Sequence, residues 1–164
     1  MAQSRGTVKI RKMVDADLPR VNEIDRLLSG ARRVSTWPFS FESYWSVYRP
    51  QLSFVAEVGG KVAGFIVGTV AQEEHSRSVL NLRHGQDLPV QRQHRQDGWV
   101  DMIGVDPAYQ GMGAGRALVQ AFRDECLRID AGMRALATES DKTLRGFFEG
   151  AGLKTSGLVL YESD

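Results

Sequence analysis

The most informative segment of this chain is Val105-Asp106-Pro107-Ala108-Tyr109-Gln110-Gly111-Met112-Gly113-Ala114-Gly115-Arg116-Ala117-Leu118, which joins an apolar run to a helical pattern. Three glycines in five residues let the backbone approach a ligand closely, because glycine has no Cβ. The first N–H groups of the following helix have no partner within it, and the helix dipole adds partial positive charge there. The segment therefore predicts an anion site, most naturally for phosphate, at a strand-to-helix turn.

Two common phosphate-binding motifs do not fit this segment. The phosphate-loop pattern with its Gly-Lys-Ser/Thr ending is absent, and the dinucleotide fingerprint needs a glycine where Arg116 stands. A glycine-rich turn also occurs where a helix start only packs closely, and that alternative stays open at this point.

The flanking residues predict a strand and a helix. In the strand Trp99–Val105, a period of two places Asp101 on one face with Ile103 and Val105, provided that no bulge intervenes. The helix 113–129 has one apolar side that includes Cys126, which favours a core role for this thiol over a nucleophilic one.

The N-terminal part predicts a strand at 8–14 and a helix that Asp15 caps, with an apolar stripe at helical spacing. Residues 37–48 hold six aromatic side chains, and their spacing predicts a second helix that ends before Pro50. These rings either belong to the core or line part of a substrate pocket, since apolar walls dominate such sites.

Two β-branched runs around Gly59-Gly60 predict a hairpin of residues 52–58 and 61–70.

The polar stretch 71–98 is expected to be a long functional connection. Its three histidines have no metal-ligand spacing and are expected to be exposed. A strand at 134–138, a helix at 143–151 and a strand at 157–162 complete one mixed α/β domain over residues 1–164.

Composition excludes several classes of protein. The net charge of the 164 residues is +1, which disfavours nucleic-acid binding. A single cysteine makes neither an internal disulfide nor a thiolate-rich zinc site, and no metal is expected. The longest nearly apolar run, Val62 to Ala71, is too short to span a membrane, and the N-terminus lacks the apolar core of a signal peptide. We expect a soluble cytoplasmic protein without a membrane partner.

The segment quoted at the start closely resembles the acetyl-CoA signature of the GNAT superfamily of N-acetyltransferases. That signature reads Gln/Arg-x-x-Gly-x-Gly/Ala after a strand ending in Val-x-Pro, and Gln110, Gly113 and Gly115 fill it. Residues 147–153, Phe-Phe-Glu-Gly-Ala-Gly-Leu, resemble the family's Leu-Tyr-Glu-x-x-Gly-Phe segment. The order of the elements matches from residue 7 to the end.

The resemblance implies a central mixed sheet of six to seven strands with four helices. The fourth and fifth strands would splay apart, and the pantetheine of acetyl-CoA would lie between them. It also implies that the main chain at Ile103, Gly104 and Val105 bonds the pantetheine and the acetyl end. The amides that would hold the pyrophosphate follow Gln110 and belong to Gly111, Met112, Gly113, Ala114, Gly115 and Arg116.

The chain departs from the family at two positions. Asp141 stands where the family often has asparagine, and Phe148 where a tyrosine usually protonates the departing thiolate. Phenylalanine has no proton to give. Both positions are retained as candidate cofactor contacts.

The function implied is acetyl transfer from acetyl-CoA to a primary amine of a small molecule or protein, by direct attack. A backbone N–H near Val105 would stabilise the oxyanion. Asp101 is the first candidate base, Glu57 the second, and Tyr161 a displaced acid. The acceptor site is expected between residues 37–48 and 71–98, and a homodimer is possible. The alternatives are a non-catalytic acyl-CoA-binding or sensing module and a phosphate-binding regulator without CoA chemistry.

Overall fold

The computed structural model describes residues 7–28, 34–35, 40–71, 96–137 and 139–155. The strands are β1 (Val8–Lys12), β2 (Val34–Ser35), β3 (Leu52–Val58), β4 (Lys61–Ala71), β5 (Gln96–Val105) and β6 (Ala131–Ala135). The α-helices are α1 (Leu18–Leu28), α2 (Phe41–Tyr48), α4 (Ala114–Arg128) and α5 (Lys142–Gly150). Two 3-10 turns, η1 (Asp15–Asp17) and η3 (Pro107–Tyr109), precede α1 and α4 respectively.

The sheet is mixed. Strands β1, β3, β4 and β5 lie in that order and are antiparallel, whereas β6 runs parallel to β5 on its outer edge. Five strands have five or more residues, against the six to seven expected, and the two-residue β2 adds a short pairing. Of the connection expected at 71–98, Ala71 belongs to β4 and residues 96–98 to β5. Residues 72–95 with their three histidines, and the strand expected at 157–162, lie outside the described residues.

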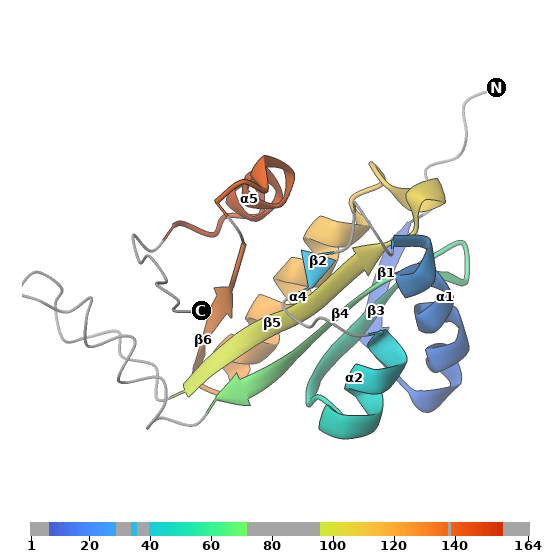
Figure 1. Cartoon of the computed structure of the whole chain (residues 1–164), viewed down its shortest axis with the longest axis horizontal. Helices are drawn as coiled ribbons and strands as arrows, with labels where there is room; N and C mark the ends of the chain where they lie inside the picture. The colour runs from blue at the N-terminus through green and yellow to red at the C-terminus, as the bar shows by residue number, and fades with distance from the viewer. Residues whose placement is uncertain (1–6, 29–33, 36–39, 72–95, 138, 156–164) are drawn as a thin grey trace, which may run out of the picture.

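The outer edge of β5 is shared by two strands. Its first half, Gln96–Val100, pairs with β6, and farther along Met102 and Ile103 pair with β2. Figure 1 shows β5 and β6 diverging from the end where they pair. The part of this edge that leads to the glycine-rich turn is therefore not paired with β6.

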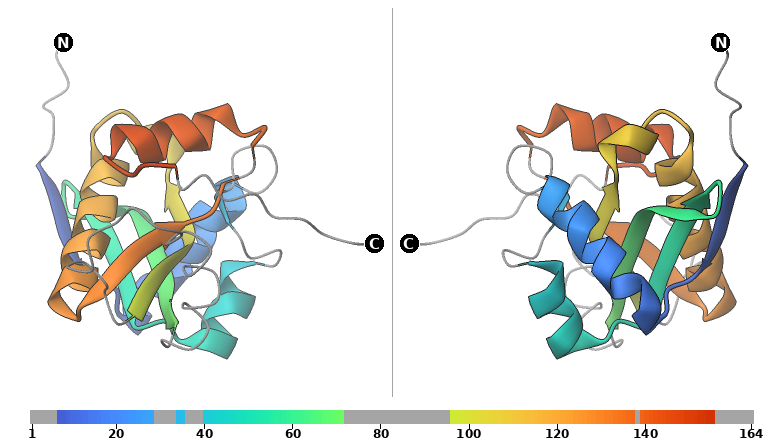
Figure 2. Two further views of the ribbon diagram at one scale, coloured as in Figure 1. Left: turned by 90° about the vertical axis from the view of Figure 1, so that its left-hand side faces the viewer. Right: turned by 90° about the vertical axis from the view of Figure 1, so that its right-hand side faces the viewer.

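Helices cover both faces of the sheet (Figure 2). Helices α1 and α2 bury Val21, Ile24 and Tyr44 on one face, and α4 buries Leu118 and Phe122 on the other. The predicted helical stripes of α1 and α4 are thus confirmed, and so is the hairpin, in which Gly59 and Gly60 have positive φ.

Four expectations about element ends were wrong. Strand β1, expected to reach residue 14, ends at Lys12. Strand β5 starts at Gln96 and β6 at Ala131, each three residues earlier than the sequence pattern predicted. Asp15 makes no capping hydrogen bond; instead the Asp17 carboxylate accepts the backbone N–H of Val14 at 2.9 Å. The 3-10 turn before α1 moves the capping role to the second aspartate.

Candidate active site

Asp106 holds the turn between β5 and α4 through three polar contacts. This buried carboxylate accepts the backbone N–H of Ala108 at 2.8 Å and forms an ion pair with Arg20 of α1. The Asp106 N–H donates to the carbonyl of Ala63 on β4 at 2.9 Å. An Asx turn of this kind stops the strand, and Pro107 cannot continue it.

The glycines after this turn leave its outer side open. Gly111 has φ +79° and Gly113 φ +89°, and a Cβ at either position would meet no atom within 4 Å. A Cβ on Gly115 would meet the Phe147 ring of α5 at 3.0 Å. The first two glycines therefore serve backbone conformation and approach from outside, and the third serves helix packing.

The backbone N–H groups of the same turn are available as hydrogen-bond donors. Among the described residues, the backbone N–H groups from Gly111 to Arg116 have no protein acceptor, while Ala117 N–H bonds to Gly113 at 3.0 Å. The Gln110 side chain donates to the carbonyl of Val105 at 3.1 Å and so braces the turn. A row of unpaired donors at a helix start, with space where side chains would stand, fits a phosphate group.

Strand β5 contains a β-bulge at Asp101. Met102 pairs with Val67 and Val100 with Gly68, so Asp101 is an extra residue that the register between the two strands skips. Val100 and Ile103 both pack in the cluster under α4, whereas Met102 packs with α1 and α2. The expectation that Asp101 shares a face with Ile103 and Val105 was wrong, because a bulge reverses the alternation of side chains.

The bulge directs Asp101 to the α2 side of the sheet. The Tyr44 hydroxyl donates to Asp101 Oδ2 at 2.6 Å. Burial raises the pKa of the Asp101 carboxyl above its ordinary value, while hydrogen bonds from Tyr44 and from Thr69 of β4 oppose the rise. Burial and the neighbouring carboxylate also raise the pKa of Tyr44, so its hydroxyl stays protonated and donates.

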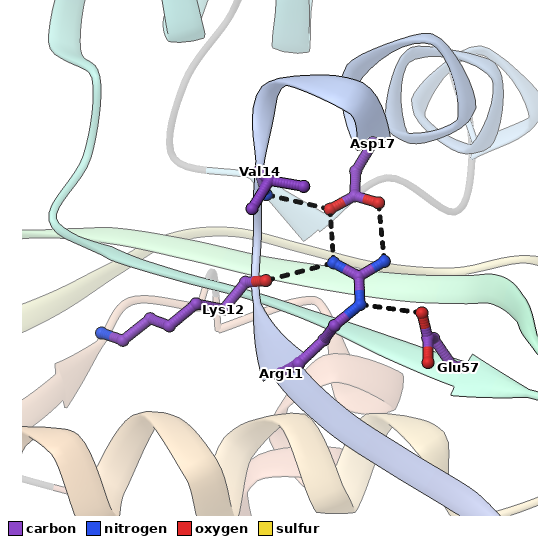
Figure 3. A network of polar contacts seen from close by, with 5 residues as sticks. All are labelled: Arg11, Lys12, Val14, Asp17 and Glu57. Atoms are coloured by element: carbon purple, nitrogen blue, oxygen red, sulfur yellow. Dashed lines mark hydrogen bonds and ion pairs between the residues drawn. The ribbon is translucent and has the colours of Figure 1, made fainter.

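Glu57, the second candidate base, lies elsewhere. It accepts the Arg11 Nε–H at 2.8 Å, and the same guanidinium makes a bidentate pair with Asp17 (Figure 3). Glu57 is opposite Val62 on β4, whereas Asp101 lies near Val67 toward the other end of that strand. The structure does not bring Glu57 and Asp101 together. Tyr161 lies outside the described residues.

The two positions that depart from the family pattern both have structural roles in α5. Asp141 accepts the backbone N–H of Leu144 at 2.8 Å, which makes it the N-cap of this helix. Phe148 is buried, with its ring centroid 5.5 Å from that of Phe147. The Phe148 ring has no proton to donate, and the Asp141 carboxyl is engaged as the helix cap.

Two of the other expected cofactor residues, Ile103 and Gly104, lie on β5 and have close neighbours. Ile103 is buried and pairs with Val34 of β2. A Cβ on Gly104 would meet Leu28 and Phe65 at 2.8 Å, which explains glycine at this position.

Tyr44 and Thr69 are contacts of Asp101 that the sequence did not reveal. The aromatic spacing identified Tyr44 as a stripe residue, but nothing marked its hydroxyl or Thr69.

The described residues include no helix long and apolar enough to cross a membrane. They also include no group of three or more His, Cys, Asp or Glu that could hold a metal ion.

Comparison with known proteins gives a family match and many structural ones. Residues 21–153 match the model of the acetyltransferase (GNAT) family. A search of curated protein sequences finds no match.

Several solved structures share the fold. The ribosomal-protein-S18-alanine N-acetyltransferase of Escherichia coli has 23% identity and a TM-score of 0.61, over 89% of this chain and 77% of that one. The aminoglycoside N-acetyltransferase AAC(6')-Iy, in complex with CoA, has 14% identity and a TM-score of 0.68, over 100% and 98%. The 6'-N-acetyltransferase AAC(6')-IG of Acinetobacter haemolyticus has 13% identity and a TM-score of 0.66, over 95% and 97%.

Proposed function

The chain belongs to the GNAT acetyltransferase family, and from that membership we propose that it transfers an acetyl group from acetyl-CoA to a primary amine. The observation that carries the proposal is the row of unpaired N–H donors from Gly111 to Arg116, which opens outward through two glycines with positive φ. Such a row is suited to the pyrophosphate of CoA. The end of β5 that leads to this turn lies beyond its pairing with β6, and its outer edge pairs with the two-residue β2 at Met102 and Ile103.

In the proposed reaction the amine nitrogen attacks the thioester carbonyl. The C–N bond forms and the oxygen gains negative charge. The C–S bond then breaks to release the CoA thiolate, and the nitrogen loses its extra proton to solvent to give the neutral amide. A backbone N–H near Val105 stabilises the oxyanion, because preorganised donors aimed at developing charge are usually the largest catalytic contribution. The thiolate of CoA leaves without a protein acid, which is consistent with phenylalanine at 148.

Asp101 is the proposed base. An alkylamine is mostly protonated at neutral pH, so a proton must leave it before attack. Asp101 is half-buried at the bulge, four residues before the end of β5, and its ionised form is supported by two neighbouring donors. Glu57 is no longer favoured, since Arg11 neutralises it at a distant part of the sheet.

The acceptor is a primary amine whose identity is open to experiment. The structural relatives are named for aminoglycosides and for the alanine of a ribosomal protein. We therefore propose a panel that includes an aminoglycoside, a peptide with an N-terminal alanine and 1,4-diaminobutane. Thiol release with any of these, dependent on both substrates, supports acetyl transfer.

The Asp101→Asn variant tests the base. It keeps the shape of the side chain and removes its basicity. We expect turnover at pH 7 to fall by about 100-fold or more, within the range of general base effects. High pH, where free amine is abundant, should restore most of it, and CoA affinity should stay unchanged. Asp124→Asn on the exposed side of α4 is the matched control. Near-normal turnover of Asp101→Asn at pH 7 would show that Asp101 is not the base.

One observation favours a second candidate function. The buried Phe148 leaves the usual acid position without a proton donor, which is also compatible with an acyl-CoA-binding or sensing module. That function predicts tight CoA binding without amine-dependent thiol release. The same assay, run beside a binding measurement with CoA, separates the two.

A further inference from the structure

A buried tyrosine on α2 holds the carboxylate at the bulge. Tyr44 is 1% exposed, and its hydroxyl donates to Asp101 Oδ2 at 2.6 Å. A distance this short is typical of an O–H group that donates to a carboxylate. The bond joins α2 to the residue at the bulge of β5, which the register with β4 skips between Val100 and Met102.

Two aromatic rings of α2 pack against the tyrosine ring. Its centroid lies 6.4 Å from that of Phe41 and 5.3 Å from that of Tyr48, which stacks on it at 25°. Helix α2 is in turn tied to α1, since the buried Asp25 carboxylate accepts the Phe41 N–H at 2.9 Å. Because packing locks the ring, the hydroxyl is placed independently of the carboxylate that it binds.

The electrostatics of this pair agree with its geometry. Among the described residues, the groups acting on the pKa of Asp101 are Tyr44 from α2 and Thr69 from β4. Tyr48 acts on Tyr44, and the charge of Asp25 on α1 is engaged at the start of α2. Both donors favour the ionised carboxylate against the effect of burial, so removing one raises the pKa of Asp101 further.

We infer that Tyr44 is the positioning residue of the acceptor site, because its hydroxyl fixes the orientation of the Asp101 carboxylate toward the incoming amine. The inference rests on the proposed function, in which Asp101 is the base. Tyr44 acts through Asp101 and contacts neither the acetyl group nor CoA. A purely structural tyrosine would matter for stability alone.

The first experiment is the pH profile of kcat/KM for the fastest amine of the panel, measured by thiol release. Tyr44→Phe removes one oxygen and keeps the ring. We expect the acidic limb of the profile to move up by about one pH unit, since a hydrogen bond to a charged group has about that effect on the equilibrium. At pH values below the limb, kcat/KM should fall about tenfold, with the KM for acetyl-CoA unchanged.

The matched control is Ile24→Val in α1, a fully buried residue of the same apolar cluster as Tyr44. It loses apolar contacts and no donor, so it should lower the melting temperature and leave the acidic limb in place. In the Asp101→Asn background, Tyr44→Phe should have no further effect on kcat/KM, because the two residues act as a unit. The inference is overturned if the acidic limb of Tyr44→Phe stays at its wild-type position. It is also overturned if Tyr44→Phe lowers kcat/KM in the Asp101→Asn variant by as much as it does alone.

A second measurement needs no acceptor. With 13C-labelled aspartate, the Asp101 carboxyl can be titrated by NMR and assigned by its disappearance in Asp101→Asn. Its pKa should be higher in Tyr44→Phe than in the wild-type protein. If that variant does not fold, 3-fluorotyrosine at position 44 provides a stronger donor and should lower the pKa of Asp101. An unchanged carboxyl pKa overturns the inference while acetyl transfer stands. Failure of every amine in the wild-type assay overturns the proposed function and, with it, this role of Tyr44.

Discussion

At the scale of single residues, Gly113 is the most sensitive position of the proposed pyrophosphate site. Its φ of +89° disfavours any residue with a Cβ, and that Cβ would project into the open side of the turn. We expect Gly113→Val to weaken CoA binding by about 10- to 100-fold, through the loss of hydrogen bonds to a charged group. The stabilisation of the protein by acetyl-CoA in thermal unfolding should shrink accordingly.

Gly60→Val is the matched control for this prediction. Gly60 also has a positive φ and open space around it, but it lies in the turn between β3 and β4. It should cost about 1–2 kcal/mol in stability, as left-handed backbone does for a residue with a Cβ, and leave CoA affinity unchanged. Wild-type CoA affinity in Gly113→Val would show that the pyrophosphate lies elsewhere.

The difference between Gly113 and Asp101 shows which site residues a sequence can reveal. A glycine-rich turn before a helix is a local signal, because the turn, the donors and the glycines are neighbours in the chain. The orientation of Asp101 depends on Gly68, a residue of another strand that allows the bulge to form. No periodicity within β5 could have shown it.

At the scale of elements, the pairing of β4 with β5 depends on the close approach of their backbones at the bulge. A Cβ on Gly68 would lie 2.0 Å from the carbonyl oxygen of Trp99 and 2.6 Å from the Phe122 ring. Since backbone cannot move aside as a side chain can, we expect Gly68→Ala to destabilise the protein by about 3 kcal/mol. Urea unfolding, followed by circular dichroism, measures the change.

Gly146→Ala in α5 makes the same chemical change where nothing lies within 4 Å. We expect it to stabilise the protein by up to about 1 kcal/mol, because alanine is the better helix former. Two Gly→Ala substitutions of opposite sign would establish that the strand contact, and not glycine itself, decides the outcome. Equal effects would contradict the close approach at Gly68.

The start of β6 shows where element prediction from this sequence failed. The segment Ala131-Gly132-Met133 has low β-propensity, so the pattern predicted a strand only from Arg134. In the structure Asp130 takes a positive φ and ends the turn after α4, and pairing with Gln96 begins at once. The parallel pairing of β6 with β5 joins residues far apart in the chain and outweighs the low β-propensity of this segment. The amphipathic helices were predictable because their apolar spacing lies within each segment.

At the scale of the whole molecule, the network in Figure 3 links the sheet edge to the start of α1 and makes stability depend on pH. Hydrogen bonds from Arg11, and one from the Val14 N–H, hold the pKa of the buried Asp17 below its ordinary value of 3.8. The stabilisation is therefore complete above about pH 4 and is lost as the pH falls through the lower value of the folded state.

We expect Asp17→Asn to lower the free energy of unfolding at pH 7 by about 1–3 kcal/mol, the effect of losing a hydrogen-bonded partner in a buried site. Unfolding in urea at pH 7 and below pH 3 tests this, since the difference from the wild-type protein should shrink at the lower pH. Asp15→Asn, at the exposed neighbouring aspartate, should change stability by less than about 0.5 kcal/mol. A difference that persists undiminished at low pH would assign the loss to packing.

The bulge of β5 also bears on how such a sheet can change through insertion and deletion. If Asp101 were removed, Val100 would still face α4, Met102 would still face α1 and α2, and Ile103 would again face α4. The apolar pattern of the strand is therefore complete without this residue. The inserted residue introduces a carboxylate into the sheet through one local shift in register, while every apolar neighbour keeps its place. Side chains at such a position can be exchanged by evolution, or by design, independently of the core that surrounds them.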